Sequence, residues 1–374
     1  MIKVAISATG LYIPPYTITN EELVESFNTY VARYNQHNAD AIAKGELTAL
    51  AESSVGFIEQ ASGIKQRYVL EKTGILDPER MHPIFHERSN EELSLMAEIS
   101  VKACQDAMNK AGKKPEDIDA VICSAANMQR AYPAMSIEIQ EALGIKGFGY
   151  DMNVACSSAT FGIEQAVNAV RTGCARAVLV VNPEITSAHH AWRDRDCHFI
   201  FGDVCTAILV ERLEDAKPGS WEVLGTKLAT VFSNNIRNNF GFMNRSEDAD
   251  PDARDKLFKQ EGRKVFKEVC PMAAEHMATH LESLGLNSAN DVRRYWLHQA
   301  NLSMNQLIAK KLLGAHEVTS DKAPVILDEF ANTASAGSII AFHRHNDDLQ
   351  QGDVGVICSF GAGYSIGSVI VHKI

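Results

Sequence analysis

Apolar runs and amphipathic stretches alternate along this chain. The runs at 177–181 and 354–358 are hydrophobic almost without interruption, which is typical of strands that are buried on both faces. The stretches 93–110, 158–172 and 272–284 instead carry apolar residues at helical spacing, with polar residues on the opposite side. Because such helices cover the faces of such strands, the pattern predicts an α/β fold with layered sheets.

The pattern occurs twice. Residues 111–127 and 284–301 each contain a helix end that closes on Gly, a short polar loop and a β-rich run that finishes in Ala-Asn. Further along, residues 151–159 (DMNVACSSA) parallel residues 328–336 (DEFANTASA), each as an Asp-led strand followed by a helix of small residues. A duplicated unit of this size predicts two related halves of one architecture.

We therefore expect two pseudo-symmetric α/β halves with central helices. The charged stretch 211–220, which also carries Pro, Gly and Ser, is typical of a joint and divides the chain into 1–215 and 216–374. Residues 26–90 are rich in His, Glu and Arg and have no counterpart in the second half. They are predicted to be an insertion on the first half.

A cysteine lies where a central helix is expected to begin. The alignment of the two halves puts Cys156 and Asn332 in nearly the same place of the two copies, and His298 ends a β-rich run between them. A helix N-terminus favours a thiolate, and imidazole exchanges protons near neutral pH. Pseudo-symmetry would bring these residues together as a nucleophile and its supporting groups.

Each of these residues also has an ordinary structural explanation. A buried Cys beside Ala is most often a small core residue, a His at a strand end is often structural, and an Asn before Thr is often a helix cap. The interpretation as a site therefore depends on the combination of the three and on the duplication.

Composition narrows the functional classes. The net charge of -11 over 374 residues disfavours general nucleic-acid binding, because phosphate neutralisation needs a basic surface. The eight cysteines form no Cys-x-x-Cys pair, which favours reduced thiols over a zinc site or disulfides, and a cytoplasmic location. No apolar run is long enough for a membrane span and the N-terminus lacks a signal-peptide pattern, so we expect no membrane association. His276 and His280 stand four residues apart, but no Glu follows His276 and no third ligand is evident, so we expect no metal site.

The residues around the three positions resemble the motif set of the β-ketoacyl-acyl-carrier-protein synthase III family, in the thiolase superfamily. The motifs occur in the family's order over nearly the full chain, and they are Ala155-Cys156, His298-Gln299-Ala300-Asn301, Asn332-Thr333-Ala334-Ser335-Ala336 and Phe360-Gly361-Ala362-Gly363. The resemblance implies a thiolase-like fold. It also implies decarboxylative Claisen condensation of an acyl-CoA starter with malonyl-acyl-carrier protein in fatty acid biosynthesis, without a cofactor.

The resemblance implies a role for each catalytic residue. Cys156 would accept the acyl group, and His298 and Asn332 would both hydrogen-bond the malonyl thioester carbonyl. Their two donors would stabilise the enolate that decarboxylation creates, by on the order of 3 kcal/mol each. The backbone N–H groups of Cys156 and Ala362 would hold the tetrahedral oxyanion, with Ala362 standing where the family usually has Gly.

Other positions imply substrate contacts. Phe57 stands where related enzymes stack a Trp on the CoA adenine, Arg195 matches the other adenine-clamping residue, and Asn301 belongs to the His motif. Tyr132 matches a Phe that lines the acyl pocket of the neighbouring subunit, which implies a homodimer. From this change and the long insertion we hypothesise a starter longer than acetyl, of medium chain length.

A basic face could dock the acidic carrier protein. Four cations are spaced as on one face of a single helix, and two more follow the His motif; they are Lys256, Lys259, Arg263, Lys267, Lys310 and Lys311. Ser303 replaces an Arg that helps docking in the family. An ordinary solvated helix face is the alternative explanation.

Other functions remain open at this point. Papain-like hydrolases also run Cys, His and Asn along the chain, but the Cys-Gly-Ser/Ala-Cys context of that family is missing. Within the superfamily, a synthase of secondary metabolism or one that joins two acyl chains without decarboxylation is an alternative. A non-catalytic scaffold is disfavoured because all three candidate catalytic residues are present.

Overall fold

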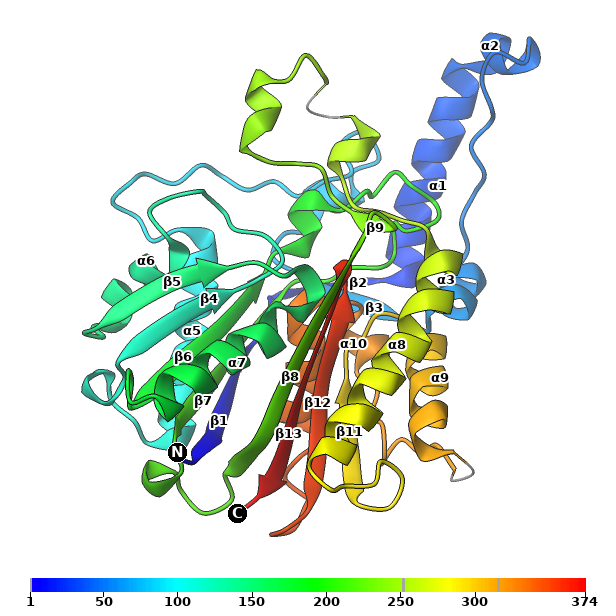
Figure 1. Ribbon diagram of the computed structural model, residues 1–374. Helices are drawn as coiled ribbons and strands as arrows, with labels where there is room; N and C mark the ends of the chain where they lie inside the picture. Colours follow the sequence, from blue (N-terminus) through cyan, green and yellow to red (C-terminus); the bar gives the residue numbers. More distant parts are fainter. Residues whose placement is uncertain (1, 251–252, 315–316) are drawn as a thin grey trace.

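A mixed nine-stranded sheet runs through the molecule, in the order β11-β12-β13-β8-β1-β7-β6-β4-β5 (Figure 1). The computed structural model describes residues 2–250, 253–314 and 317–374. The strands of this sheet are β1 (Val4–Tyr12), β4 (Ala120–Ser124), β5 (Phe148–Met152), β6 (Ala177–Glu184), β7 (Val204–Arg212), β8 (Trp221–Ser233), β11 (Val292–Leu297), β12 (Val354–Gly361) and β13 (Gly363–Lys373).

The sheet joins two sets of strands. The set from the first part of the chain is β1, β7, β6, β4 and β5, and the set from the second part is β8, β13, β12 and β11. They meet where Ala5 and Ile6 of β1 pair with Glu222 and Trp221 of β8. Parallel pairing occurs at the outer end of each set, between β4 and both its neighbours and between β11 and β12.

Helices cover both faces of the sheet. The longer ones are α5 (Leu95–Ala111), α6 (Met135–Leu143), α7 (Ser158–Arg171), α8 (Gly262–Ser283), α9 (Leu302–Leu313) and α11 (Gly337–Arg344). Side chains of β6 alternate between two cores: Val178 and Val180 pack with α7, whereas Leu179 and Val181 pack with α5. A third core lies between α8, α9 and the second set of strands. The predicted α/β layering is confirmed.

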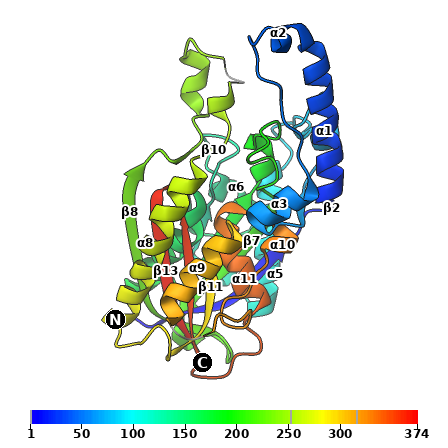
Figure 2. The same cartoon turned by 90° about the vertical axis from the view of Figure 1, so that its right-hand side faces the viewer.

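Residues 26–90, which are predicted to be an insertion, form a projecting arm and its base together with the residues just before them. The elements of this region are β2 (Tyr16–Thr19), which precedes the predicted segment, α1 (Asn20–His37), which begins before it, and α2 (Ala39–Ala43), α3 (Val55–Ser62), β3 (Gln66–Val69) and α4 (Thr73–Leu76). In Figures 1 and 2, α1 extends away from the sheet with α2 at its outer end. Thr19 and Glu22 form a reciprocal capping box that begins α1.

The base of this arm is anchored in the body of the molecule. Phe27 of α1 stacks on the buried His198, with ring centroids 4.3 Å apart. Arg67 of β3 is fully buried and donates to the carbonyl oxygens of Ile18 and Phe199 and to Asn20 Oδ1. The remaining short elements are β9 (Ile236–Arg237), β10 (Lys259–Gln260) and α10 (Leu327–Phe330).

Candidate active site

Cys156 lies in a tight turn directly before α7. The turn is the short 3-10 segment Ala155–Ser157, and Ala155 adopts a left-handed φ of 45°. Asn153 Oδ1 accepts a hydrogen bond of 2.9 Å from the Ala155 N–H and so supports this conformation. Gly361 lies against the turn, because a Cβ there would come within 3.0 Å of Cys156 Sγ. Only glycine allows this approach.

A second turn of the same form precedes α11. It is the 3-10 segment Ala334–Ala336, in which Ala334 has a φ of 47°. Asn332 Oδ1 accepts from the Ala334 N–H at 2.9 Å. The two turns contact each other, and the Cys156 turn also contacts β12.

The structure of the two turns shows that the alignment of the two halves from sequence was wrong. By backbone and hydrogen bonds, Asn332 corresponds to Asn153, and Cys156 corresponds to Ser335, so the sequence alignment was displaced by two residues. The physical reason is that Asp328 lies in the helix α10, whereas Asp151 lies in the strand β5. The Asp-led segments are therefore not equivalent, although the residues near the contact between the turns are those expected.

His298 follows the last residue of β11 and is buried. The backbone N–H of His298 donates to the Cys358 carbonyl of β12 at 2.8 Å. The imidazole packs edge to face with the Phe360 ring, with ring centroids 5.3 Å apart. Burial lowers the pKa of His298 to about 4, so the imidazole is neutral at pH 7. Its Nδ1 has no hydrogen-bond partner among the described residues.

The thiol of Cys156 is protonated at neutral pH in this structure. Burial raises its pKa to about 12, and the nearby Glu184 carboxylate acts in the same direction. The backbone N–H groups of Ala362 and Cys156 act in the opposite direction, because they point to the sulfur. The stabilisation expected from the helix end is therefore outweighed by desolvation, and a reaction at this thiol needs a proton acceptor.

Glu184 is a buried acid that the sequence interpretation missed. It ends β6 and accepts from the Ala126 N–H at 3.1 Å and from the Ser335 N–H at 3.2 Å, and the Ser335 hydroxyl also donates to it. Burial raises its pKa to about 8. The available signal was an acidic residue three positions after the apolar run 177–181, in AVLVVNPE.

Two family models match separate stretches of the chain, one around Cys156 and one around His298 and Asn332. The model for 3-oxoacyl-(acyl-carrier-protein) synthase III matches residues 150–231, and the model for the C-terminal part of the same enzymes matches residues 281–373. A beta-ketodecanoyl-(acyl-carrier-protein) synthase from Pseudomonas aeruginosa is 60% identical over 351 residues, which is 94% of this chain and 100% of the relative. The chain belongs to the 3-oxoacyl-(acyl-carrier-protein) synthase III family.

More distant comparisons agree. A beta-ketoacyl-(acyl-carrier-protein) synthase III from Bartonella tribocorum is 27% identical and covers 89% of this chain and 95% of that relative. The crystal structure of the synthase III from Aquifex aeolicus shares the fold, with a TM-score of 0.76 at 22% identity, over 99% of this chain and 100% of that one. The predicted family and thiolase-like fold are confirmed, and the chain is an acyltransferase of the condensing type.

The residues expected to clamp CoA in this synthase lie together. The guanidinium carbon of Arg195 is 3.9 Å from the centroid of the Phe57 ring, and Arg195 Nε donates to the Glu52 carbonyl at 2.6 Å. Asn301 has a local role as well. Its Oδ1 accepts from the Ser303 N–H to cap α9, and its Nδ2 donates to the Ala61 carbonyl at 2.7 Å. A substrate role of Asn301 stays a prediction.

The expected basic face of the synthase is divided. α8 begins at Gly262, so Lys256 and Lys259 do not lie on the helix of Arg263 and Lys267 as predicted. The chain is held in a non-helical path there because Phe258 is buried against Phe201, with ring centroids 4.7 Å apart. Lys256 pairs with Glu247.

The other four cations remain available on two packed helices. Arg263 and Lys267 lie on α8, and Lys310 and Lys311 lie on α9, which contacts α8. All four are exposed, and within the part of the chain that the structure describes no ion-pair partner occurs for them.

The described part of the synthase contains neither a cluster of metal-ligating side chains nor a helix able to cross a membrane. In residues 2–250, 253–314 and 317–374, no group of three or more His, Cys, Asp and Glu side chains could hold a metal ion. No helix in the same ranges combines the length and the hydrophobicity that a bilayer crossing requires.

Proposed function

We propose that this synthase condenses a medium-chain acyl-CoA with malonyl-acyl-carrier protein and releases carbon dioxide. The observation that supports this most is the contact between the Cys156 turn and the Asn332 turn. Gly361 lies against Cys156, and its neighbour Phe360 packs on His298. The chain is also 60% identical to a synthase named for a β-ketodecanoyl product. Such a product contains an octanoyl starter plus the two carbons that a malonyl group retains. Octanoyl-CoA is therefore the donor that we expect.

The first step is acyl transfer to the thiol. Cys156 Sγ attacks the thioester carbonyl while neutral His298 takes its proton, and the proton is returned to the leaving CoA thiolate. The backbone N–H groups of Cys156 and Ala362, which point to the sulfur, are suited to the oxyanion of the tetrahedral intermediate. This assignment is supported by the neutral state of both side chains, of which His298 is buried and Cys156 is half-buried.

The second step is decarboxylation and carbon–carbon bond formation. The C–C bond to the malonyl carboxylate breaks, carbon dioxide leaves, and its electron pair forms an enolate that attacks the acyl-Cys156 carbonyl. His298 and Asn332 donate to the enolate oxygen. In support, Asn332 Nδ2 has no acceptor among the described residues, whereas its Oδ1 is held by the Ala334 N–H.

Partners and assembly are part of the proposal. Arg263, Lys267, Lys310 and Lys311 would dock the acidic carrier protein, and Phe57 and Arg195 would lie at the CoA site. A homodimer is supported by Tyr132, which is 85% exposed, and by the unpaired edge strand β5, whose Phe148 and Tyr150 are exposed.

Two further assignments accompany it. We place the division between the halves at 215 and 216, supported by the loop between β7 and β8. The eight free cysteines support a reducing, cytoplasmic environment, and no cofactor is required by the steps above.

The test uses the purified wild-type protein. Incubation with octanoyl-CoA should add one octanoyl group, detected by intact-mass analysis, and addition of malonyl-acyl-carrier protein should release carbon dioxide and remove the adduct. Acetyl-CoA as the sole acylating donor would contradict the chain-length proposal. Octanoyl transfer without malonyl-dependent carbon dioxide release would contradict the condensation.

A further inference from the structure

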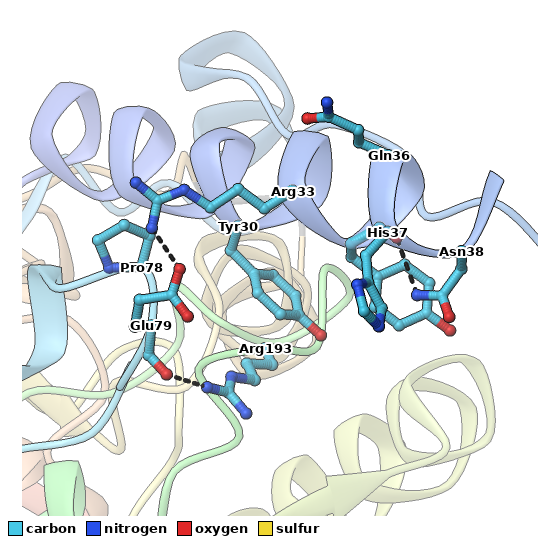
Figure 3. Close-up of a pocket in the computed structure, with 9 residues that line it drawn as sticks. Tyr30, Arg33, Gln36, His37, Asn38, Pro78, Glu79 and Arg193 are labelled. Carbon is cyan, nitrogen blue, oxygen red and sulfur yellow. Dashed lines mark hydrogen bonds and ion pairs between the residues drawn. The ribbon is translucent and has the colours of Figure 1, made fainter.

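Polar side chains outside the two turns of the candidate active site are used in two ways. In a cleft of about 630 Å³ between α1 and the body of the molecule, they bond to one another at the surface (Figure 3). Arg33 pairs with Glu79 there, and Arg193 donates to the Glu79 carbonyl. Because the Arg33 and Glu79 side chains are 54% and 74% exposed, their pair contributes little to stability. Tyr364 of β13 differs, because its residue is only 3% exposed and its hydroxyl bonds to two other segments of the chain.

The end of the β12–β13 hairpin forms one side of the proposed oxyanion site. Gly361 pairs with Ser365, so residues 362–364 connect the two strands. The backbone N–H of Ala362 points to the Cys156 sulfur. The direction of this N–H therefore depends on the contacts that hold the connection 362–364.

Ser365 holds the hairpin to the Cys156 turn. The Ser157 hydroxyl donates to the Ser365 carbonyl at 3.0 Å, and the Ser365 hydroxyl donates to the Ala362 carbonyl at 2.9 Å. Both serines are buried. These bonds fix the hairpin on the side of the nucleophile.

Tyr364 holds the same hairpin to α8. Successive side chains of a strand point to opposite faces, and β13 contacts the Cys156 turn as well as α8, which lies beside it in Figure 1. The Tyr364 ring packs in the core that Val265 and Val269 of α8 enter. Its hydroxyl donates to Glu268 Oε2 at 2.7 Å. Burial raises the pKa of Tyr364, so this hydroxyl keeps its proton and remains a donor at neutral pH.

Asn235 completes the network from the segment between β8 and β9. Its Nδ2 donates to the Tyr364 hydroxyl at 2.8 Å and to Glu268 Oε2 at 3.1 Å. Its carbonyl accepts from the N–H of Glu261, directly before α8, at 2.8 Å. One hydroxyl therefore joins the hairpin to a helix and to a second segment, and a bond to a carboxylate is stronger than a bond between neutral groups.

We propose that Tyr364 is a positioning residue for the oxyanion site, and that Glu268 and Asn235 act through its hydroxyl. Their bonds fix the connection 362–364 to α8 and so keep the Ala362 N–H directed at the reacting carbonyl. The inference rests on the proposed function, because it assumes that this N–H stabilises the tetrahedral oxyanion. Tyr364 would touch no reacting atom and would still affect both steps in which an oxyanion forms at this carbonyl.

The experiment follows octanoyl transfer to Cys156 in a single turnover. The purified full chain is mixed with increasing concentrations of octanoyl-CoA, and the adduct is measured over time by intact-mass analysis. Tyr364→Phe keeps the ring and removes only the hydroxyl. Loss of a whole oxyanion donor costs about 100-fold to 1,000-fold in rate, so a displaced donor should lower the maximum rate about tenfold. The half-saturating concentration of octanoyl-CoA should not change, because the hydroxyl does not bind the donor.

The second step should slow in Tyr364→Phe as well. The enolate attacks the same carbonyl, now on acyl-Cys156, and a second tetrahedral oxyanion forms at the same N–H groups. This step is measured as the disappearance of the octanoyl adduct after preformed octanoyl enzyme is mixed with malonyl-acyl-carrier protein. A loss confined to the second step would contradict the proposal, because it would place the defect at the enolate.

A double-mutant cycle tests whether Glu268 acts through the hydroxyl. Glu268→Ala should slow octanoyl transfer about threefold, because Asn235 still holds the hydroxyl, whereas Glu268→Gln retains an acceptor oxygen and should keep the wild-type rate. Glu268→Ala added to Tyr364→Phe should cause no further loss. Glu268 is exposed on α8, so its variants test the proposal even if Tyr364→Phe does not fold.

Tyr295→Phe is the matched control. Tyr295 lies in the same core, and its hydroxyl donates to the Ser288 carbonyl in the connection between α8 and β11. Tyr295→Phe should lower the free energy of unfolding about as much as Tyr364→Phe does, because each removes a hydroxyl bond from one core. It should leave the rates of both steps as in the wild type.

The outcomes separate this inference from the proposed function. A wild-type rate in Tyr364→Phe, or an equal loss of rate in Tyr295→Phe, would overturn the positioning role. Additive losses from Glu268→Ala and Tyr364→Phe would overturn the action of Glu268 through the hydroxyl. A wild-type protein that takes no octanoyl group from octanoyl-CoA would overturn the proposed function instead.

Discussion

The Cys156 turn and the Asn332 turn share a backbone and differ in chemistry. Each contains an Asn whose side chain accepts from an alanine N–H at 2.9 Å, and each alanine has a left-handed φ, 45° in one and 47° in the other. In the first turn, Asn153 also donates to the Ala126 carbonyl, so both ends of its amide are used. In the second, Asn332 keeps a free N–H₂ group among the described residues.

The different hydrogen-bond partners show how the same turn can present different polar side chains in the two halves. The position that carries Cys156 in the first turn carries Ser335 in the second, and the Ser335 hydroxyl donates to the buried Glu184. The position that carries Asn153 in the first turn carries Asn332 in the second. The thiol and the free amide N–H₂ group therefore lie at different positions of the same backbone form.

The largest expected effect comes from moving the thiol between the turns. Cys156→Ala should abolish the octanoyl adduct, and Cys156→Ala combined with Ser335→Cys should not restore it, because the Ser335 position is buried and directed to Glu184. Intact-mass analysis measures both. An adduct on the double variant would mean that the two turns are chemically interchangeable.

The two asparagines should differ by a large factor. Asn332→Ala should slow malonyl-dependent carbon dioxide release about 100-fold, the cost of one lost donor to an oxyanion, while octanoyl transfer continues. Asn153→Ala removes only hydrogen bonds within the turn, so it should lower the free energy of unfolding by about 1–2 kcal/mol with a smaller effect on the rate. Similar rate losses in the two variants would contradict the distinction.

Glu184 should make stability depend on pH. Burial raises its pKa to about 8 from 4.5, so between these values the folded state holds a proton that the unfolded state has lost. The contribution of Glu184 to the free energy of unfolding is thus greatest below pH 4.5 and falls as pH rises to about 8. In Glu184→Gln this fall should disappear from denaturant titrations between pH 6 and 9, above the range in which Asp203, whose pKa burial raises to about 6, contributes a fall of its own.

The control for this experiment is Glu214→Gln, at a carboxylate that is 75% exposed. It should leave the pH profile as in the wild type. If Glu184→Gln shows the wild-type slope as well, the buried carboxylate is not the group that titrates.

The smallest expected effect concerns His298. Burial lowers its pKa to about 4, so the imidazole is already neutral across pH 6 to 8. The rate of the decarboxylation step, measured with preformed octanoyl enzyme, should change by less than about twofold over this range. A twofold to tenfold loss centred near pH 6.5 would show that His298 titrates as an ordinary histidine and that the site is more hydrated than the structure indicates.

The local motifs were sufficient to predict the fold class and the three candidate catalytic residues. Continuous apolar strands and amphipathic helices require layers, and the order of the Cys, His and Asn motifs is specific. The register of the duplication was wrong by two residues, because sequence similarity followed Asp151 and Asp328, which lie in different kinds of element. Helical spacing alone also extended the basic face back to Lys256, before the helix begins.

The sequence by itself therefore determined the architecture and the choice of candidate reactive groups, since periodicity and residue chemistry are local properties. Only the tertiary structure decided their surroundings: a thiol whose pKa burial raises, a buried Glu184 that joins β6 to the second turn, and a cleft beneath α1. Each of these depends on desolvation or on contacts between segments far apart in the chain, and neither can be read from the order of residues.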